Sequence, residues 1–592
     1  MRRLTEGTRR PMNGPSELEP SQVKAVSTMC LMQAPTPLLT TADLQRETAG
    51  RRLVHQSLDY WAERNPDGLA VINATRGRSL TWLQLCDGSL VVAQNLRRMG
   101  LRPGDFLAAS LPFLSEHIIL EYACFRAGII HTPLDLRLGP AETLRQVASI
   151  GARGFAFLGK TPAADFRELA KAVKANCPCV EFLLQFSPPQ DCLDEATPAA
   201  KLFETPAAHL PPVEIAEDQS AQVIFTTGST GSPKPALLSH RGIVSQNCSL
   251  GRAFQFGPAQ RVLLNLPASH VGGQAEILMT SLFSGGLAVV LEVFDATLSL
   301  EAIQKHKVTL LGQIPAMFQM EWRLGSYASY DLSSLGSVVY GGQAVPRPFL
   351  DKMRTMGPRL ATGLGLTETS GFCTYTPLVS DPAELEGTLG HAAPSYPLTI
   401  RGSMRADGIA GDERAPGETG YVCFRGPQNF LGYVNDPAST AQTLSTDGWL
   451  YTGDMGRLDE RGLSLSGRAK FVIKTAGYQV FPGDVENHFN ALGDRVASVG
   501  VVGHEHAIWS EAIVAFVEPR PGAELTVADL RRHARALAGY MRPLHYVLLE
   551  PGTMPLNRAA KVDTLALQEM ARAEVARLRK RGRWDGGAQE AQ

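Results

Sequence analysis

The chain has 592 residues, and its 57 Lys plus Arg against 58 Asp plus Glu give a formal net charge of −1. This balance argues against a nucleic-acid or anionic-membrane partner, because neither would attract a nearly neutral protein. Hydrophobic residues make up 44% of the chain, which supports a large core and excludes a disordered protein.

The cysteines and the hydropathy pattern both indicate a cytoplasmic protein. Nine cysteines are scattered along the chain without a Cys-x-x-Cys pair, which predicts free thiols and neither a disulfide framework nor a zinc site. The uncharged stretch 25–42 comes nearest to a membrane segment, but Pro35 and Pro37 disfavour a spanning helix there. We therefore expect no integral membrane segment.

The first residues, 1–45, are rich in Arg, Pro, Ser and Thr without an apolar period, and we expect a disordered leader. An Arg-rich start also fits a transit peptide. Three acidic residues argue against this interpretation: Glu6, Glu17 and Glu19. The translation start stays open, because three later methionines are alternatives: Met12, Met29 and Met32.

Two helices are predicted at the start of the ordered chain. Val54, Leu58 and Trp61 fall on one helical face, and the Asn-Pro pair that follows ends this helix. Thr81 is placed to cap the start of a second helix. Two arginines followed by Gly100 form the pattern expected at a helix C-terminus and mark its end.

The rest of the chain predicts an α/β protein with a second, smaller domain. Short apolar runs such as 106–111, 154–158 and 287–291 alternate with helical segments, which favours largely parallel sheets. Near residue 402 the strands shorten and Gly, Asp and Thr become frequent. The run after Gly467 predicts a small α+β domain with elements at 484–492 (helix), 498–503 and 512–518 (strands), 526–538 (helix) and 545–550 (strand). We expect domains at 46–467 and 468–577 and a flexible tail at 578–592.

The most informative segment follows the predicted strand 223–225. It combines hydroxyl side chains, two glycines whose backbone N–H groups can converge on an anion, and a lysine: Thr226, Thr227, Gly228, Ser229, Thr230, Gly231 and Lys234. The spacing differs from the GxxxxGK[ST] loop of GTPases. By itself this composition indicates a phosphate-binding loop, with a Ser/Gly surface turn as the alternative.

This loop resembles the signature of the adenylate-forming superfamily, which comprises acyl- and aryl-CoA synthetases, luciferases and peptide-synthetase adenylation domains. The similarity extends from roughly residue 50 to 570 and is greatest to a free-standing acid–CoA ligase. It implies a large N-terminal domain of layered α/β sheets plus a distorted β-barrel. A hinge would join this domain to the small C-terminal one.

Two further motifs resemble the acyl-binding segments of that superfamily. In the "PxxH" segment, the resemblance makes His270 a gate between acyl group, nucleotide and thiol tunnel. Amino-acid-activating domains carry an Asp here, and Ser269-His270 therefore favours a substrate without an α-amine. Gly341, Gly342 and Gln343 match the "GGAPL" turn, which flanks adenine and the acyl chain.

The segment 362–369 resembles "GYGxTE". The resemblance makes Thr367 a phosphate ligand and Glu368 the ligand of Mg²⁺, a role suited to a carboxylate. Leu364, beside Gly365, replaces the tyrosine that usually stacks on adenine, which would cost roughly 1 kcal/mol of binding free energy.

The remaining motifs carry the charged groups. By resemblance, Asp454 of "TGD" accepts the ribose hydroxyls, Arg468 of "GRxKD" holds ribose or phosphate, and Lys470 lies at the hinge. Phe471 replaces the usual acidic residue, which removes a possible salt bridge. Lys561 matches the adenylation lysine.

A last loop resembles the one that faces the active site during thioester formation, and it contains Lys474, Gly477 and Gln479. The resemblance implies that Lys561 points inward for adenylation and that this loop replaces it for the thiol step. Two departures restrict the backbone modestly: Pro235 and Ala560 stand where glycine is usual.

These motifs predict an ATP-dependent carboxylic acid–CoA ligase. It would form an acyl-AMP with ATP and Mg²⁺, and then transfer the acyl group to CoA with release of AMP and pyrophosphate. One alternative is a ligase that loads the acyl group onto a separate carrier protein. The other is a non-catalytic relative that binds nucleotide or acyl ligands.

Overall fold

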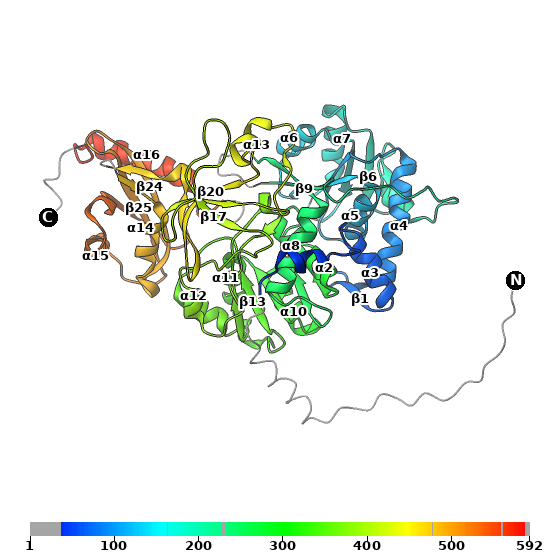
Figure 1. The fold of residues 1–592 in the computed structure, drawn as a ribbon, viewed down its shortest axis with the longest axis horizontal. Helices are drawn as coiled ribbons and strands as arrows, with labels where there is room; N and C mark the ends of the chain where they lie inside the picture. The colour runs from blue at the N-terminus through cyan, green and yellow to red at the C-terminus, as the bar shows by residue number, and fades with distance from the viewer. Residues whose placement is uncertain (1–36, 163, 227–232, 476–477, 558–560, 586–592) are drawn as a thin grey trace, which may run out of the picture. The chain divides into compact units, whose positions relative to one another are not determined.

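A computed structural model describes residues 37–162, 164–226, 233–475, 478–557 and 561–585 (Figure 1). The described residues from Leu38 onward belong to one compact unit, so the expected division at 467/468 stays a prediction. Cysteines within these ranges are free, as predicted. No helix in the described chain combines the length and the apolar character needed to cross a membrane.

Ordered structure extends into both the expected leader, 1–45, and the expected tail, 578–592. Helix α2 (Thr41–Glu47) begins inside the expected leader, and Leu39 before it is only 1% exposed. At the other end, helix α16 (Thr564–Lys580) extends into the expected tail, and Trp584 is also 1% exposed. Composition could not reveal these two apolar anchors in polar segments. The remainder of the leader and of the tail lies outside the described residues.

The first two predicted helices are confirmed. Helix α3 (Gln56–Arg64) ends before the Asn-Pro pair, and helix α4 (Trp82–Met99) follows Thr81. The Thr81 hydroxyl accepts a hydrogen bond from the Gln84 backbone N–H, which satisfies a free donor of the first turn. Gly100 ends α4 with φ of +109°, a conformation that disfavours any residue with a Cβ.

One sheet has eight strands in the order β19-β9-β8-β4-β3-β5-β6-β7. Its pairs are parallel except β8 with β9 and β9 with β19. The strands are β3 (Phe106–Ser110), β4 (Ile130–Pro133), β5 (Gly154–Leu158), β6 (Phe182–Phe186), β7 (Thr197–Pro198), β8 (Ser220–Phe225), β9 (Pro235–Ser239) and β19 (Gly432–Tyr433). The helices that connect its parallel strands are α5 (Ser115–Ala127), α6 (Pro140–Ile150) and α7 (Phe166–Asn176).

A second sheet has seven strands in the order β14-β13-β12-β10-β11-β1-β2, all parallel except β1 with β2. Its strands are β1 (Leu69–Asn73), β2 (Arg78–Thr81), β10 (Arg261–Leu264), β11 (Leu287–Val290), β12 (Leu310–Gln313), β13 (Ser337–Tyr340) and β14 (Arg359–Ala361). The helices in this part are α8 (His240–Ala253), α9 (Thr280–Ser284), α10 (Ala296–His306), α11 (Pro315–Trp322) and α12 (Arg347–Arg354).

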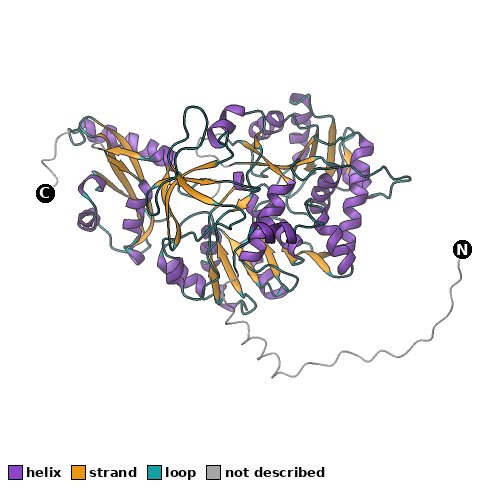
Figure 2. Ribbon diagram, viewed as in Figure 1, coloured by secondary structure: helices purple, strands orange, loops and turns teal. Residues whose placement is uncertain are grey.

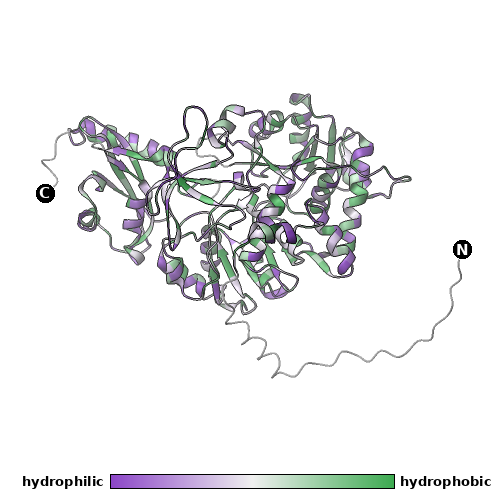
Figure 3. Cartoon of the chain, in the orientation of Figure 1, coloured by the Kyte–Doolittle hydropathy of each residue, from purple (hydrophilic) through white to green (hydrophobic). Residues whose placement is uncertain are grey.

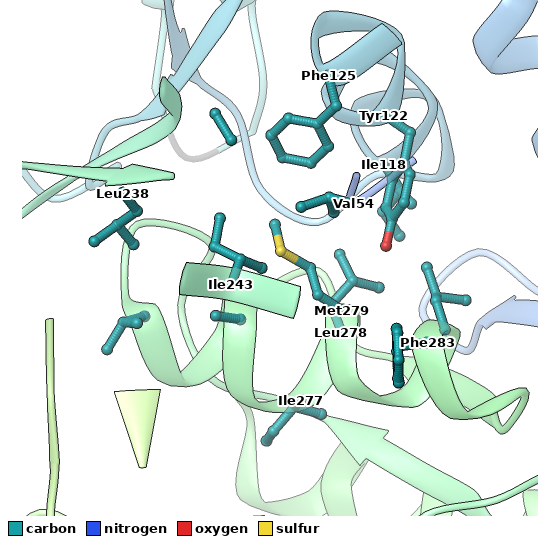
Figure 4. Close-up of a cluster of buried hydrophobic side chains, with 14 of the residues drawn as sticks. Val54, Ile118, Tyr122, Phe125, Leu238, Ile243, Ile277, Leu278, Met279 and Phe283 are labelled. Carbon is teal, nitrogen blue, oxygen red and sulfur yellow. The ribbon is translucent and has the colours of Figure 1, made fainter. Parts of the chain in front are cut away.

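The largest core cluster joins these layers. It brings Phe125 of α5 and Ile243 of α8 together with Met279, the last residue of a π-helix, η3 (Gly272–Met279). In Figure 4, Met279 points toward Ile243, whereas Ile277 lies on the other side of the helix. Both residues belong to the same core cluster, and Ile277 lies toward the second sheet, since its Cδ1 is 3.7 Å from the position that a Cβ on Gly312 of β12 would take. Figure 3 shows the same division for the central strands, which are coloured hydrophobic beneath helices with hydrophilic outer faces.

A third, antiparallel sheet of four strands occupies the place of the expected barrel (Figure 2). Its strands are β17 (Leu398–Arg401), β18 (Gly420–Phe424), β20 (Leu450–Asp459) and β21 (Gly462–Arg468). A short hairpin, β15 (Gly365–Leu366) with β16 (Gly371–Phe372), and helix α13 (Pro437–Thr443) belong to the same half of the chain. The predicted α/β class is confirmed.

The C-terminal part has the predicted order of helix, two strands, helix and strand. Its elements are β22 (Ile473–Thr475), β23 (Tyr478–Val480), α14 (Pro482–Asn490), β24 (Val496–His506), β25 (Ser510–Pro519), α15 (Val527–His533), β26 (His545–Leu548) and α16. The second helix is shorter than expected, because a 3-10 turn replaces its last residues after His533. Apolar residues of β24 and β25 pack with those of α14 and α15 to form a core of the C-terminal part.

Candidate active site

A cavity of about 2000 Å³ collects most of the predicted site residues. It is bordered by the ends of strands from both large sheets, by the third sheet and by C-terminal residues. The predicted residues that line it are Thr226, Lys234, His270, Gly341, Gly342, Gln343, Leu364, Gly365, Thr367, Glu368, Asp454, Arg468, Lys470 and Lys561. Motifs separated by more than 300 positions thus meet at one place.

The two ends of the predicted phosphate loop are joined to each other. The Thr226 backbone N–H donates to the Lys234 carbonyl at 2.9 Å, and the Lys234 N–H donates to the Thr226 hydroxyl at 3.2 Å. These bonds continue the antiparallel pairing of β8 with β9, in which Phe225 faces Pro235. Pro235 is the first residue of β9. Residues 227–232, between the two ends, lie outside the described chain.

Glu368 lies beside a tyrosine that no motif indicated. The Tyr433 hydroxyl donates to Oε1 of Glu368 at 2.6 Å, and the Lys234 ammonium lies 5.1 Å from the centroid of the same ring. Burial and the Glu368 carboxylate raise the pKa of Tyr433 above its usual value, so the phenol stays protonated and donates. Tyr433 therefore links the loop lysine to the predicted metal ligand.

The residues around Glu368 fit a bound Mg²⁺. Magnesium in nucleotide enzymes uses one or two carboxylates and completes its shell with water and phosphate oxygens. One carboxylate in a cavity with the Thr226 and Thr367 hydroxyls suits that pattern. The described chain holds no cluster of three or more acidic, His or Cys ligands, which an all-protein site would need.

Changing Tyr433 to Phe tests this link. The substitution removes the hydrogen bond to Glu368 and keeps the ring beside Lys234. Because partners behind a metal ligand commonly contribute about tenfold to metal affinity, we expect the Mg²⁺ concentration for half-maximal adenylation to rise about tenfold. A magnesium titration of pyrophosphate exchange measures it. An unchanged Mg²⁺ requirement would exclude this role for Tyr433.

Asp454 and Arg468 lie directly opposite each other on β20 and β21. The Arg468 Nε is 2.8 Å from Oδ1 of Asp454, and its Nη1 donates to the Thr452 carbonyl at 3.0 Å. Asp454 is 6% exposed, and burial raises its pKa while Arg468 and Lys561 oppose that effect. The pair presents one carboxylate and one guanidinium to the cavity at fixed positions.

Lys561 is held by its own loop. Asn557 accepts from the Lys561 N–H at 3.1 Å through its side chain and donates its own N–H to the Lys561 carbonyl at 2.8 Å. The Cε of Lys561 lies 3.6 Å from the position that a Cβ on Gly342 would take. Burial lowers the pKa of this lysine, Arg468 lowers it further, and two carboxylates, Asp454 and Glu276, oppose them. Lys561 thus contributes an ammonium group beside the turn at Gly342.

His270 is neutral in this environment. Its Nδ1 accepts a hydrogen bond of 3.0 Å from the Gly272 backbone N–H, which leaves Nε2 as the protonated nitrogen. Burial, followed by the nearby charge of Lys561, lowers its pKa to about 4. The imidazole therefore lines the cavity without adding a second positive charge beside Lys561.

The part of the cavity wall that the sequence predicts to face adenine combines Leu364 with a glycine turn. Gly342 has φ of +97°, a left-handed conformation that favours glycine at this turn. Leu364 is 9% exposed and packs in a cluster with Tyr396 and Leu398, while part of its surface lines the cavity. It presents an aliphatic surface where the family uses an aromatic ring.

Changing Leu364 to Tyr should lower the KM for ATP about fivefold. A stacked ring adds roughly 1 kcal/mol of binding free energy to a purine. Leu364→Met is the matched control, since it keeps the volume and adds no ring. Steady-state kinetics with varied ATP measure the change, and an unchanged KM would mean that adenine is held elsewhere.

The loop predicted to face the active site during thioester formation lies away from the cavity in this structure. Lys474 and Gln479 are exposed cross-strand partners on β22 and β23, and neither lines the cavity. Gly477 lies outside the described residues. Lys470, the predicted hinge residue, is on a 3-10 turn, η7 (Ala469–Phe471), with its ammonium 4.5 Å from the Phe471 ring. This distance is within the range of a cation–π contact.

Tyr433 and Glu276 line the cavity, although the sequence analysis did not single them out. Tyr433 left no signal, because a tyrosine in a short strand is usually structural. Glu276 did leave one, since it is the only charged residue between His270 and Glu292, in a run that otherwise reads as buried. Its isolation in an apolar segment marks it as a residue that needs a partner.

The comparisons with known proteins agree with this geometry. Residues 58–434 match the model of the AMP-binding enzyme family, and residues 484–561 match that of the AMP-binding enzyme C-terminal domain. A feruloyl-CoA synthase from Amycolatopsis sp is 29% identical over 504 residues, which cover 83% of this chain and 94% of the relative. The fatty acid–[acyl-carrier-protein] ligase ScoC from Streptomyces coeruleorubidus is 28% identical, with 88% and 97% covered.

Among solved structures, ATP-bound MatB from Rhodopseudomonas palustris superposes with a TM-score of 0.75. The two chains are 23% identical, and the match covers 88% of this chain and 98% of MatB, so it supports the fold alone. The family model covers well over half of the sequence, and the C-terminal model matches a separate segment, 484–561. This chain belongs to the AMP-binding enzyme family.

Proposed function

We propose that this chain is an ATP-dependent carboxylic acid–CoA ligase of the AMP-forming type. The observation that carries the proposal is the meeting of Lys561, the Asp454–Arg468 pair and the phosphate-loop ends in one cavity. Lys561 is partly buried there, and the charges of Asp454 and Glu276 oppose the lowering of its pKa. The relatives named for CoA and carrier-protein ligation support the same activity.

The first step needs charge neutralisation rather than a base. A carboxylate is already ionised at neutral pH, and it attacks the α-phosphate of ATP while pyrophosphate leaves. Lys561, Lys234 and Arg468 place three cations around the cavity, where they would offset the charge that accumulates on the phosphates. Bound Mg²⁺ would polarise the phosphate oxygens from the Glu368 side. Asp454 would accept the ribose hydroxyls.

The second step replaces AMP by a thiol. The thiol of CoA loses its proton and attacks the acyl carbonyl, and AMP leaves with the bonding electron pair. We propose that Lys474, Gly477 and Gln479 face the cavity in this step in place of Lys561. Lys470 would then lie at the hinge of that exchange.

The acceptor has a second candidate, a phosphopantetheine carrier protein. Similarity to the fatty acid–[acyl-carrier-protein] ligase favours it, because the match covers nearly all of both chains. The same loop could serve either thiol.

We propose a cytoplasmic location for either activity. The free thiols of the described chain suit this location.

A product assay tests the proposal. Purified protein is incubated with ATP, Mg²⁺ and a panel of aliphatic, aromatic and alicyclic acids, with either CoA or a carrier protein as acceptor. Mass spectrometry should detect acyl-CoA and AMP in equal amounts for at least one acid. Thioester on the carrier protein alone would favour the second candidate, and neither product from any acid would reject both.

A further inference from the structure

Four buried polar side chains form a hydrogen-bonded network that has no role in the steps described above. They are His117 and Glu121 on α5, His131 on β4 and Gln222 on β8, and each is 0% exposed. The core around them is apolar, and Phe125, one turn beyond Glu121 on the same helix, is part of it (Figure 4). Polar groups in such a core are costly unless they bind one another.

The hydrogen bonds of the two histidines all run in one direction. Nδ1 of His117 lies 2.8 Å from the Pro112 carbonyl, which only accepts, so this nitrogen carries the proton. Burial lowers the pKa of His117 to about 4 and that of His131 to about 3, so both rings are neutral. Nε2 of His117 is therefore an acceptor, and Nε2 of His131, 3.0 Å away, donates to it. Nδ1 of His131 remains as an acceptor that needs a donor.

Gln222 supplies this donor. Its Nε2 lies 3.3 Å from Nδ1 of His131 and donates to Oε1 of Glu121 at 2.8 Å. A reversed amide would point its oxygen at the His131 acceptor, so the network fixes the orientation of the Gln222 side chain. Burial raises the pKa of Glu121 to about 8, which makes it a neutral acceptor at pH 7. Oε2 of Glu121 and Oε1 of Gln222 have no partner in the described chain, a cost that stability alone does not explain.

The network lies where the eight-stranded sheet has a short strand pairing. β8 pairs with β9 at several positions, whereas it pairs with β4 at one, where Gln222 lies opposite His131. The side chains of this same pair contact each other, and Glu121 adds a bond from α5 above the sheet. Side-chain hydrogen bonds therefore supplement the short backbone pairing between β4 and β8.

The β8–β9 pair brackets the predicted phosphate loop. Thr226, the first loop residue, follows Gln222 by four positions, and Lys234 directly precedes β9. Both Thr226 and Lys234 line the cavity, and they are hydrogen-bonded to each other. A change in the attachment of β8 to β4 would therefore move both ends of the loop together.

We propose that Gln222 is a positioning residue for the ATP half of the reaction. Held by Glu121 and His131, it attaches the β8–β9 pair to the rest of the sheet and so sets the position of both ends of the phosphate loop. The inference rests on the proposed function, because it concerns the ATP side of that reaction. A misplacement of about 1 Å costs about 100-fold in rate, so adenylation depends on this attachment. Thioester formation starts after pyrophosphate has left and depends on it far less.

The first test compares the two half-reactions in Gln222→Met, which keeps the side-chain length and removes both polar atoms. In pyrophosphate exchange, kcat/KM for ATP should fall by roughly 10- to 100-fold, while thioester formation from supplied acyl-AMP should stay within about threefold of the parent rate. Gln222→Asn, which is one methylene shorter, is the second variant if Gln222→Met does not fold, and it should show the same difference. Equal losses in the two half-reactions would overturn the proposal.

Gln185→Met is the matched control. Gln185 is also a fully buried glutamine of the same sheet, on β6, and its hydrogen-bond partners all lie in the loop after that strand. Its replacement should lower the melting temperature and affect the two half-reactions alike. A difference between them as large as in Gln222→Met would overturn the proposal, because any buried glutamine of the sheet would then have the same effect.

Two variants of Glu121 test the neutral acceptor. Glu121→Gln keeps the shape and an acceptor oxygen, so both half-reactions should stay within about threefold of the parent rates. Glu121→Met removes the acceptor and should slow pyrophosphate exchange selectively, as Gln222→Met does. Equal losses of exchange in Glu121→Gln and Glu121→Met would contradict the role of a neutral acceptor.

Calorimetry of ATP binding separates this inference from the proposed function. With Mg²⁺ and without acid, the Kd for ATP should rise by roughly tenfold in Gln222→Met and stay within about threefold of the parent in Gln185→Met. This result supports the inference even if no acid is adenylated, in which case only the function fails. Equal ATP affinity in the parent and in Gln222→Met would overturn the inference even if adenylation occurs.

Discussion

Replacing Lys561 with alanine is expected to slow adenylate formation by at least about 100-fold, while thioester formation from supplied acyl-AMP stays within a few-fold of the parent rate. The structure gives the reason for the difference. Lys561 lines the cavity with Arg468 and Asp454, whereas Lys474 and Gln479 lie away from it. The lysine therefore serves the conformation in which ATP and the acid react.

The two half-reactions are measured separately, by pyrophosphate exchange and by release of AMP from acyl-AMP and CoA. Lys580→Ala, at the exposed end of α16, is the control and should leave both rates unchanged. Equal losses in both half-reactions of Lys561→Ala would contradict the role assigned to this residue.

The pH dependence gives an independent check. Burial and Arg468 lower the pKa of Lys561 below its ordinary value of 10.5, so adenylation should decline at a lower pH than an ordinary lysine would allow. An arginine at this position stays charged throughout this pH range. In Lys561→Arg the alkaline decline of the adenylation rate should therefore move to higher pH, even if the maximal rate is lower. The pH profile of the acyl-AMP half-reaction should not move.

Replacing Asp454 with asparagine should raise the KM for ATP by roughly 10- to 100-fold. The variant keeps the shape of the side chain, but it leaves Arg468 without its carboxylate partner at 2.8 Å and weakens a ribose acceptor. The loss should be smaller in kcat than in KM, because we propose that this pair holds the nucleotide in both steps. Steady-state kinetics with varied ATP provide the measurement.

A double-mutant cycle isolates the contact itself. If Asp454 and Arg468 act as a pair, the combined variant with Arg468→Gln should lose less than the two single variants added together. Strict additivity would mean that each residue binds ATP alone. An unchanged ATP KM in Asp454→Asn would remove Asp454 from the nucleotide site.

Much of the fold could be predicted because its signals are local. Thr81 and Gly100 mark the ends of α4, and both act through backbone geometry that neighbouring residues determine. The Asp454–Arg468 contact was less obvious, but it follows from a hairpin that places these positions opposite each other. Local order was sufficient for α4, whereas the Asp454–Arg468 contact emerged only from the pairing of β20 with β21.

The remaining features depend on tertiary packing. Glu276 faces the cavity because a π-helix changes the direction of its side chains, and no sequence period predicts where such a turn occurs. Tyr433 reaches Glu368 from a strand 65 residues away in sequence. The buried Leu39 and Trp584 lie in segments whose composition resembles flexible termini. Each of these outcomes depends on contacts that form only in the folded chain.

Acid-dependent exchange between pyrophosphate and ATP tests the central claim most directly, because it reports reversible formation of an acyl-AMP without requiring any thiol. The purified chain with Mg²⁺, ATP, labelled pyrophosphate and a broad acid panel should incorporate label into ATP for at least one acid. Lys561→Ala should lose that incorporation. No acid-dependent incorporation from any member of the panel would contradict the assignment of this cavity to carboxylate activation.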